Sequence, residues 1–214
     1  MKNSSKFASL GIILFVFFLI LSVLVSLNIF GQIDYSSTIA FQSFFPNYVI
    51  TPFSIFSILG SAEIIGLILL IILLLFSKVR KIYILLFFAA VGVIELLGKT
   101  IIVHYGPPIE LLKTNISLGL PSNTIPHEFF SYPSGHASRT AFVSAVLIFA
   151  LWKSHLRKEL KISFAILVLS FDILMFVSRI YLGEHWLTDV VGGALLGFSL
   201  AFFISYFLKP KPAK

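Results

Sequence analysis

The chain has 214 residues, of which 58% are hydrophobic and only 12% charged, with a formal net charge of +7 and a mean hydropathy of +1.01. A soluble domain needs far more charge on its surface, so this composition excludes one and indicates a single integral membrane domain over residues 1–214. The absence of cysteine excludes disulfides, thiol catalysis and Cys-ligated metal.

Apolar runs of transmembrane length set the predicted fold class, which is an all-α bundle of six membrane-spanning helices. A helix needs about 20 apolar residues to cross a bilayer. The first run is longer than the core of a signal peptide, so it is retained as a helix. The predicted helices cover residues 8–30, 54–77, 82–102, 136–153, 162–182 and 186–208.

Two connections between these runs are long enough to carry features of their own. Residues 31–50 are rich in aromatic side chains, which favour the membrane interface, and Asp34 is expected to be solvated there. The longest connection, residues 103–133, is rich in Pro, Ser, Asn and Gly, and residues 109–113 suggest a short amphipathic lid.

The distribution of basic residues predicts the orientation of the chain. Twelve of the sixteen Lys and Arg residues flank the apolar runs on the side of the two termini. The positive-inside rule therefore places both termini in the cytoplasm and the other side outside. The same distribution explains the basic pI of 9.7 without nucleic acid as a partner. The remaining four, on the outer side, are Lys99, Lys113, Arg139 and Arg179.

The most informative segment runs from Ser178 to Asp189, at the junction of the fifth and sixth predicted helices. His185 and Asp189 are four residues apart at the start of a helix, so they lie on one face. A carboxylate beside one ring nitrogen holds the proton there and leaves the other nitrogen free to attack. Arg179 adds a guanidinium, which binds phosphate oxygens in a bidentate manner. The segment indicates covalent phosphoryl chemistry.

A second polar cluster, Pro-Ser-Gly-His at residues 133–136, opens the fourth predicted helix. Helix N-termini favour anions through their free N–H groups and the helix dipole. His136 is placed to donate a proton to a leaving oxygen. Lys99 ends the third helix on the same side, and Glu95 lies one turn deeper as its i,i+4 ion-pair partner. These side chains are expected to converge at the outer ends of the third to sixth helices.

The two clusters resemble the motifs of the type 2 phosphatidic acid phosphatase superfamily, which also includes vanadium haloperoxidases. That family carries a Lys followed after six residues by Arg-Pro, then Pro-Ser-Gly-His, then Ser-Arg, five residues, His, three residues and Asp. The second motif is complete at residues 133–136, and the third is complete between Ser178 and Asp189. The motifs span residues 99–189, and the six-helix layout extends the resemblance over nearly the whole chain.

The resemblance implies a role for each matched residue. His185 resembles the nucleophile that becomes phosphohistidine, Asp189 its orienting partner and His136 the general acid. Family members of this kind need no metal or other cofactor, and the sequence offers no cluster with metal-ligand spacing. The implied phosphate cradle consists of Lys99, Ser134, Gly135 and Arg179.

The first motif departs from the family pattern. Its arginine position, seven residues after Lys99, holds Gly106, and Pro107 follows as expected. One phosphate-binding cation is therefore missing. Arg139, one helical turn into the fourth helix, is the first candidate to replace it, and His104 is the second.

The leading hypothesis is a lipid phosphatase that hydrolyses a polyprenyl pyrophosphate or a phosphatidate-like lipid at the outer leaflet. One alternative is transfer of the phosphoryl group to another lipid instead of water. The other is a lipid-binding or transport protein with a degenerate phosphatase site, which the loss of the arginine at Gly106 favours. The partners expected are the bilayer and a membrane lipid substrate, and the sequence does not set the oligomeric state.

Overall fold

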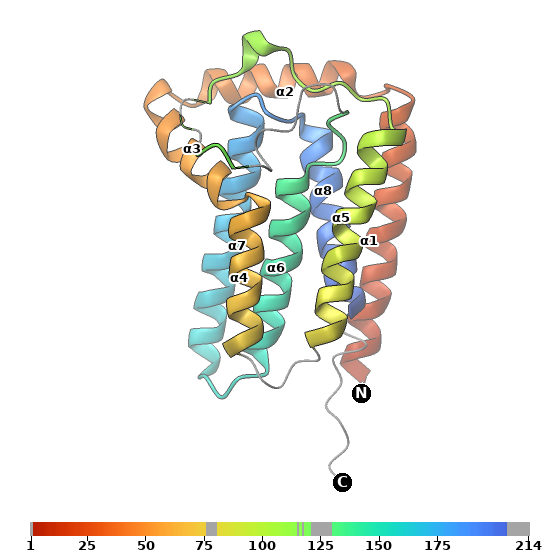
Figure 1. Cartoon of the computed structure of the whole chain (residues 1–214), viewed down its shortest axis with the longest axis vertical. Coiled ribbons are helices and arrows are strands. Elements are labelled where there is room, and N and C mark those ends of the chain that lie inside the picture. The colour runs from red at the N-terminus through yellow and green to blue at the C-terminus, as the bar shows by residue number, and fades with distance from the viewer. Residues whose placement is uncertain (1, 76–80, 115, 117, 121–129, 205–214) are drawn as a thin grey trace.

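The structure is a computed structural model in which the regular elements are all helices, as predicted, and the described residues include no strand (Figure 1). It describes residues 2–75, 81–114, 116, 118–120 and 130–204. Long helices stand side by side, and one shorter helix lies across their upper ends. The elements are α1 (Lys2–Ser26), α2 (Gly31–Phe44), η1 (Asn47–Val49), α3 (Ile50–Leu59), α4 (Ala62–Leu75), α5 (Lys81–Ile101), η2 (Ile109–Leu111), α6 (Gly135–Trp152), α7 (Lys158–Tyr181) and α8 (Leu187–Ile204).

The predicted six spans are recovered, with corrections to two of them. Among the described residues, five helices are long and apolar enough to cross a membrane, and a bent pair makes the sixth. The first predicted run continues to residue 30, but α1 ends at Ser26, and Asn28 has a positive φ of 54° in the turn that follows. This turn separates α1 from α2, which lies across the bundle.

The second predicted run, residues 54–77, is broken and not straight. Helix α3 with η1 meets α4 at an angle of 57°. The break falls at Gly60-Ser61, and Gly/Ser pairs are among the recognised causes of sharp kinks. A Cβ on Gly60 would lie 3.1 Å from the ring of His136. The bend therefore brings α3 over the upper end of α7 and against the base of the candidate site.

Helices α6 and α8 form the centre of the bundle, and both are mostly buried. They approach closely because small residues face each other, as is common for helices that pack within membranes. A Cβ on Gly193 would lie 2.9 Å from Cβ of Ala137, and one on Gly197 would lie 2.9 Å from Cβ of Ala141. This contact fixes the N-terminal end of α8 against that of α6.

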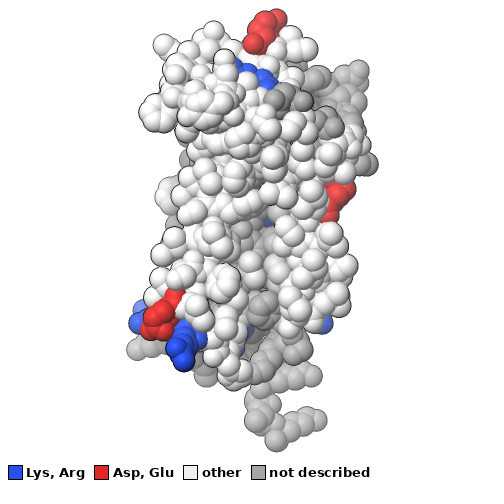
Figure 2. Space-filling view, turned by 90° about the vertical axis from the view of Figure 1, so that its left-hand side faces the viewer, with Lys and Arg blue, Asp and Glu red and all other residues white. Residues whose placement is uncertain are grey.

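The sides of the bundle are apolar, as a lipid-facing surface requires. Many large apolar side chains on α1, α4, α5 and α7 are exposed. Figure 2 shows one such face, on which the middle is mostly uncharged. On the described elements, Lys81 at the start of α5 and Lys158 at the start of α7 lie at the end opposite α2.

Helix α2 is amphipathic in the sense opposite to that of a helix on a soluble protein. Asp34 and Thr38 are four residues apart and buried, and Gln42, a further turn on, donates to the carbonyl of Leu111 at 2.7 Å. Exposed apolar residues cover its other face. An inward polar stripe and an outward apolar surface suit a helix that lies in the membrane interface. The expectation that Asp34 is solvated is wrong, because its exposed fraction is 2%.

The long connection between α5 and α6 is anchored at both of its ends. The backbone N–H of Ser131 donates to the carbonyl of His104 at 2.8 Å, so the beginning and the end of the connection meet. Midway, the N–H of Lys113 donates to the carbonyl of Leu182 at 2.9 Å. The suggested lid at residues 109–113 is a single 3₁₀ turn, η2, and not an α-helix.

Candidate active site

The predicted pairing of His185 with Asp189 is confirmed. His185 lies in the turn between α7 and α8, and its Nδ1 is 3.3 Å from Oδ2 of Asp189 in the first turn of α8. Asp189 is fully buried, and His185 is 7% exposed. Because a carboxylate accepts, Nδ1 carries the proton and Nε2 keeps its lone pair. The contact therefore fixes both the tautomer and the orientation of the imidazole.

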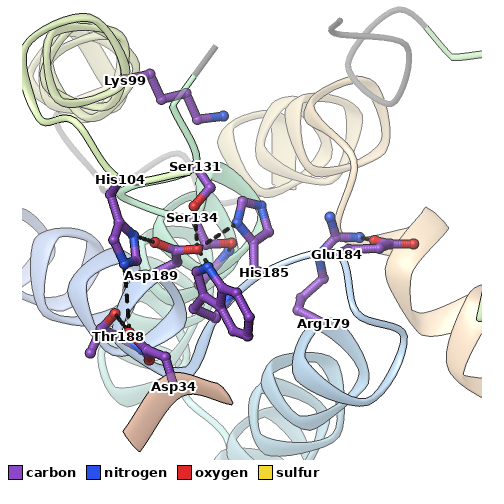
Figure 3. Close-up of polar contacts among 12 residues, drawn as sticks. Asp34, Lys99, His104, Ser131, Ser134, Arg179, Glu184, His185, Thr188 and Asp189 are labelled. Carbon is purple, nitrogen blue, oxygen red and sulfur yellow. Dashed lines mark hydrogen bonds and ion pairs between the residues drawn. The ribbon is translucent and has the colours of Figure 1, made fainter. Parts of the chain in front are cut away.

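The carboxylate of Asp189 is held by three further groups besides His185 (Figure 3). Its Oδ2 accepts from the hydroxyl of Ser131 at 2.6 Å and from the backbone N–H of Trp186 at 2.9 Å. Its Oδ1 is 2.9 Å from Nδ1 of His104. Charge-assisted bonds of this kind fix both the position and the ionised state of a buried carboxylate.

His104 and Asp34 extend this network away from His185. The Nε2 atom of His104 is 3.6 Å from Oδ2 of Asp34, and Asp34 also accepts from the N–H and the hydroxyl of Thr188 at 2.9 and 2.7 Å. His104 therefore lies between two carboxylates. This position does not match the prediction of His104 as a replacement for the lost phosphate-binding arginine, because both of its ring nitrogens face acids within the protein.

Lys99 and Arg139 converge on one carboxylate, that of Glu95. The predicted i,i+4 pair is confirmed, with Nζ of Lys99 3.0 Å from Oε1 of Glu95. Nη1 of Arg139 is 2.6 Å from Oε2 of the same residue. A Cβ at Gly135 would collide with this carboxylate, so any side chain at the start of α6 would have to displace Glu95 from its contacts with Lys99 and Arg139. The first candidate replacement, Arg139, thus lies beside Lys99 and the N-terminus of α6.

Arg179 is held by partners that sequence reasoning did not identify. Its Nη1 makes an ion pair with Glu184 and a hydrogen bond to the hydroxyl of Ser57 on α3. Ser57 also donates to Glu184 at 3.1 Å, and the hydroxyl of Thr114 in the long connection bonds the other carboxylate oxygen. Nε of Arg179 is buried and has no hydrogen-bond partner among the described residues.

His136 is brought to the same place by the first turn of α6. Its exposed fraction is 4%, and its Nε2 is buried without a hydrogen-bond partner among the described residues. Its ring lies within electrostatic range of Arg179, Arg139, Lys99 and His185. The site therefore combines two imidazoles with three cations, which is the convergence that the sequence predicts.

Ser134 is placed as the N-cap of α6. Its side chain accepts from the backbone N–H of Ala137 at 3.5 Å, and its own N–H donates to the carbonyl of Asp189 at 2.9 Å. The second contact ties the first turns of α6 and α8 together. Ser134 is fully buried between the two helix ends.

The electrostatics of the site keep His185 neutral. Burial lowers the pKa of His185 to about 4; its hydrogen bond to Asp189 raises the pKa, and the positive charge of Arg179 lowers it further. At neutral pH the unprotonated nitrogen is therefore available, as nucleophilic attack requires.

The chain is similar in sequence and in fold to proteins from a Bacillus species. The family model described as PAP2 superfamily matches residues 82–212. Phosphatidylglycerophosphatase B of Bacillus subtilis (strain 168) is 40% identical over 80 residues, which make up 36% of this chain and 39% of that relative. The matched stretch thus spans less than half of the relative's length.

The similarity of the fold extends much further along the chain. The crystal structure of a transmembrane PAP2 type phosphatidylglycerolphosphate phosphatase from Bacillus subtilis aligns with a TM-score of 0.76 at 27% sequence identity. That alignment covers 92% of this chain and 94% of the other. The α1 to α4 region, which lies before the matched family residues, is therefore part of the shared fold.

Proposed function

Because the chain belongs to the PAP2 superfamily, whose model matches more than half of its residues, we propose that it is a membrane lipid phosphatase that works through a phosphohistidine on His185. The observation that carries the proposal is the convergence of the oriented His185 imidazole with His136 and three cations. Simple binding of a lipid headgroup does not require an imidazole held by a buried carboxylate. We treat residues 1–214 as one domain.

The chemistry follows from the positions of the two imidazoles. Nε2 of His185 attacks the terminal phosphorus, the N–P bond forms, and the bond from that phosphorus to the leaving oxygen breaks; this oxygen is the ester oxygen of a monophosphate or the bridging oxygen of a pyrophosphate. His136 donates its proton to the departing oxygen. Asp189 stabilises the positive charge that develops on His185. In the second step His136 takes a proton from water, the water oxygen attacks phosphorus, and the N–P bond breaks to release phosphate.

The charge on the phosphoryl group is met by Lys99, Arg139 and Arg179. In this structure each of the three is paired with a carboxylate, either Glu95 or Glu184. A dianionic phosphate would compete with these carboxylates for the same donors, and guanidinium groups bind it in a bidentate manner. Arg139 then supplies the positive charge of the motif arginine, whose position in this chain is occupied by Gly106. We propose that these residues suffice without a metal ion.

The substrate class follows from the lipid-facing bundle and from the relatives. A polyprenyl pyrophosphate and a phosphatidate-like lipid fit the proposal, and both Bacillus relatives carry names that specify phosphatidylglycerophosphate. The clustering of basic residues at the end opposite the site supports cytoplasmic termini and an outward-facing site. On that face, a carrier lipid pyrophosphate and a phosphorylated glycerolipid both present a terminal phosphate on a membrane anchor, joined through an anhydride in the first and through an ester in the second.

The test is phosphate release by detergent-purified protein in excess chelator. The four substrates are phosphatidylglycerophosphate, phosphatidic acid, a polyprenyl pyrophosphate and a polyprenyl monophosphate. We expect release by the wild type, none by His185→Ala, and unchanged release by the matched control His155→Ala, whose histidine is exposed in the α6–α7 connection. The four rates rank the headgroups.

Three outcomes would contradict the proposal in whole or in part. Release that requires added metal would remove the metal-free mechanism. No release from any substrate, in protein shown to be folded, would favour the degenerate lipid-binding or transport protein. A phosphorylated acceptor lipid, in place of free phosphate, would identify a phosphotransferase that uses the same phosphohistidine.

A further inference from the structure

One buried carboxylate in this site is shared by two imidazoles. Oδ2 of Asp189 faces Nδ1 of His185 at 3.3 Å, and Oδ1 faces Nδ1 of His104 at 2.9 Å. Beyond His104 lies a second carboxylate, that of Asp34, at 3.6 Å from Nε2. Four side chains from α2, the long connection, the α7–α8 turn and α8 therefore form one continuous row (Figure 3).

The surroundings of His104 favour its doubly protonated form. An imidazole with a carboxylate beside each ring nitrogen donates to both only as a cation. Burial by itself lowers the pKa of His104, but its hydrogen bond to Asp189 and the nearby carboxylates of Asp189 and Asp34 outweigh burial and raise the pKa to about 9. Among the described residues the other titratable group that faces it is Tyr132, with ring centroids 6.4 Å apart. Burial raises the pKa of Tyr132, so that residue is neutral.

We propose that His104 is a positioning residue of the phosphatase reaction, which as an imidazolium holds Asp189 against His185 and draws part of the carboxylate's charge toward itself. Asp34 holds His104 in turn. This inference rests on the proposed function. His104 acts on the nucleophile through Asp189 and does not touch the phosphate.

The arrangement has a consequence for the phosphohistidine step. When Nε2 of His185 is bonded to phosphorus, its Nδ1 still carries a proton that Asp189 accepts. A carboxylate that also accepts from a cationic His104 is a weaker base, so it leaves that proton on His185. A phosphohistidine protonated at Nδ1 has the better leaving group, and the N–P bond breaks more readily when water attacks. No bond forms to His104 in either step.

Two substitutions by amide side chains separate the contact of His104 with Asp189 from its contact with Asp34. The amide nitrogen of asparagine falls near the place of Nδ1, so His104→Asn keeps a donor toward Asp189 without the charge. The amide nitrogen of glutamine falls near the place of Nε2, so His104→Gln keeps a donor toward Asp34 and loses the one toward Asp189. We expect kcat to fall in both variants, more in His104→Gln, by about 10- to 100-fold, while KM is unchanged. His155→Asn is the matched control.

The pH dependence distinguishes positioning from a merely structural role. In the wild type, kcat should fall as pH rises through about 9, where His104 loses its proton. In His104→Asn this alkaline limb should disappear, and the rate should equal that of the deprotonated wild type. Wild-type kcat and an unchanged alkaline limb in both amide variants would overturn the proposal, and so would a loss of kcat explained wholly by a loss of folded protein.

A measurement without substrate separates this inference from the proposed function. In histidine-labelled protein, ring nitrogen resonances report the protonation of each imidazole. We expect one histidine to stay doubly protonated to about pH 9, to vanish from the spectra of His104→Asn, and to titrate lower in Asp34→Asn. If all histidines titrate below about 7, near the ordinary value, the inference fails even when the phosphatase activity is present.

Discussion

The close contact of α6 with α8 predicts that a single methyl group at Gly197 disrupts both stability and catalysis. A Cβ there would lie 2.9 Å from Cβ of Ala141 and 3.0 Å from the backbone nitrogen of Phe142, and closer still to the carbonyl oxygen of Ser138. Carbon atoms in good contact are about 3.5–4.0 Å apart. The two helices must therefore separate by roughly 1 Å, since backbone atoms cannot rotate away as side chains do.

The expected magnitude has two parts. Overpacking of this kind costs about 1–3 kcal/mol, which lowers the melting temperature by roughly 2–12 °C for a chain of this size. Because α6 carries His136 and α8 carries Asp189, the separation also misplaces the proposed acid, His136, relative to the proposed nucleophile, His185. A misplacement of about 1 Å lowers kcat by as much as 10²-fold.

The assay compares Gly197→Ala with Gly92→Ala on α5, where a Cβ meets nothing within 4 Å. Both changes replace a helical glycine by the best helix former, so their effect on helix propensity is matched. Thermal unfolding in detergent and phosphate release are measured on both. If Gly197→Ala is as stable and as active as Gly92→Ala, the contact between α6 and α8 is not as tight as described, and the reasoning is refuted.

Two further predictions concern the charges of the site. Since the pKa of His185 is lowered to about 4, its imidazole should keep a single proton from pH 8 to pH 5 and gain the second only as pH approaches 4, as read from ring nitrogen resonances; titration of this ring near 6.5 would contradict the burial argument. Glu95→Gln removes the shared partner of Lys99 and Arg139, so we expect a loss of about 2 kcal/mol in the free energy of unfolding, measured in denaturant. Added phosphate should restore part of this stability, and Glu110→Gln at exposed η2 is the control.

Much of the fold was predictable because hydropathy and length suffice to locate helices in a membrane protein. The bend between α3 and α4 was not, since both halves are uniformly apolar and only Gly60-Ser61 marks the break. The helix in residues 31–44 was also missed, because its polar residues recur at every fourth position within an aromatic stretch that reads as an interfacial connection. The inward turn of Asp34 depends on what lies beneath α2, which no local pattern reveals.

The contacts of the site are likewise of two kinds, those that the sequence predicts and those that it does not. Pairs that sit one turn apart on one helix, such as Glu95 with Lys99, follow from spacing alone. Contacts between distant segments do not: Asp34 meets Thr188 across 154 residues, and His104 meets Asp189 across 85. The ion pair of Glu184 with Arg179 has a local signal in the sequence, because the two residues are only five apart and Glu184 is next to His185.

The site depends on helix α2, which lies outside the matched family region. Residues 82–212 contain every recognised motif, yet the carboxylate that supports His104 and the N-terminus of α8 comes from Asp34, far outside them. An exchange of segments between relatives would therefore have to move α2 together with the start of α8 and the residues after α5. A chimera joined at residue 82 would inherit the motifs of one parent and the membrane-surface helix of another, and the mismatch would fall on Asp189.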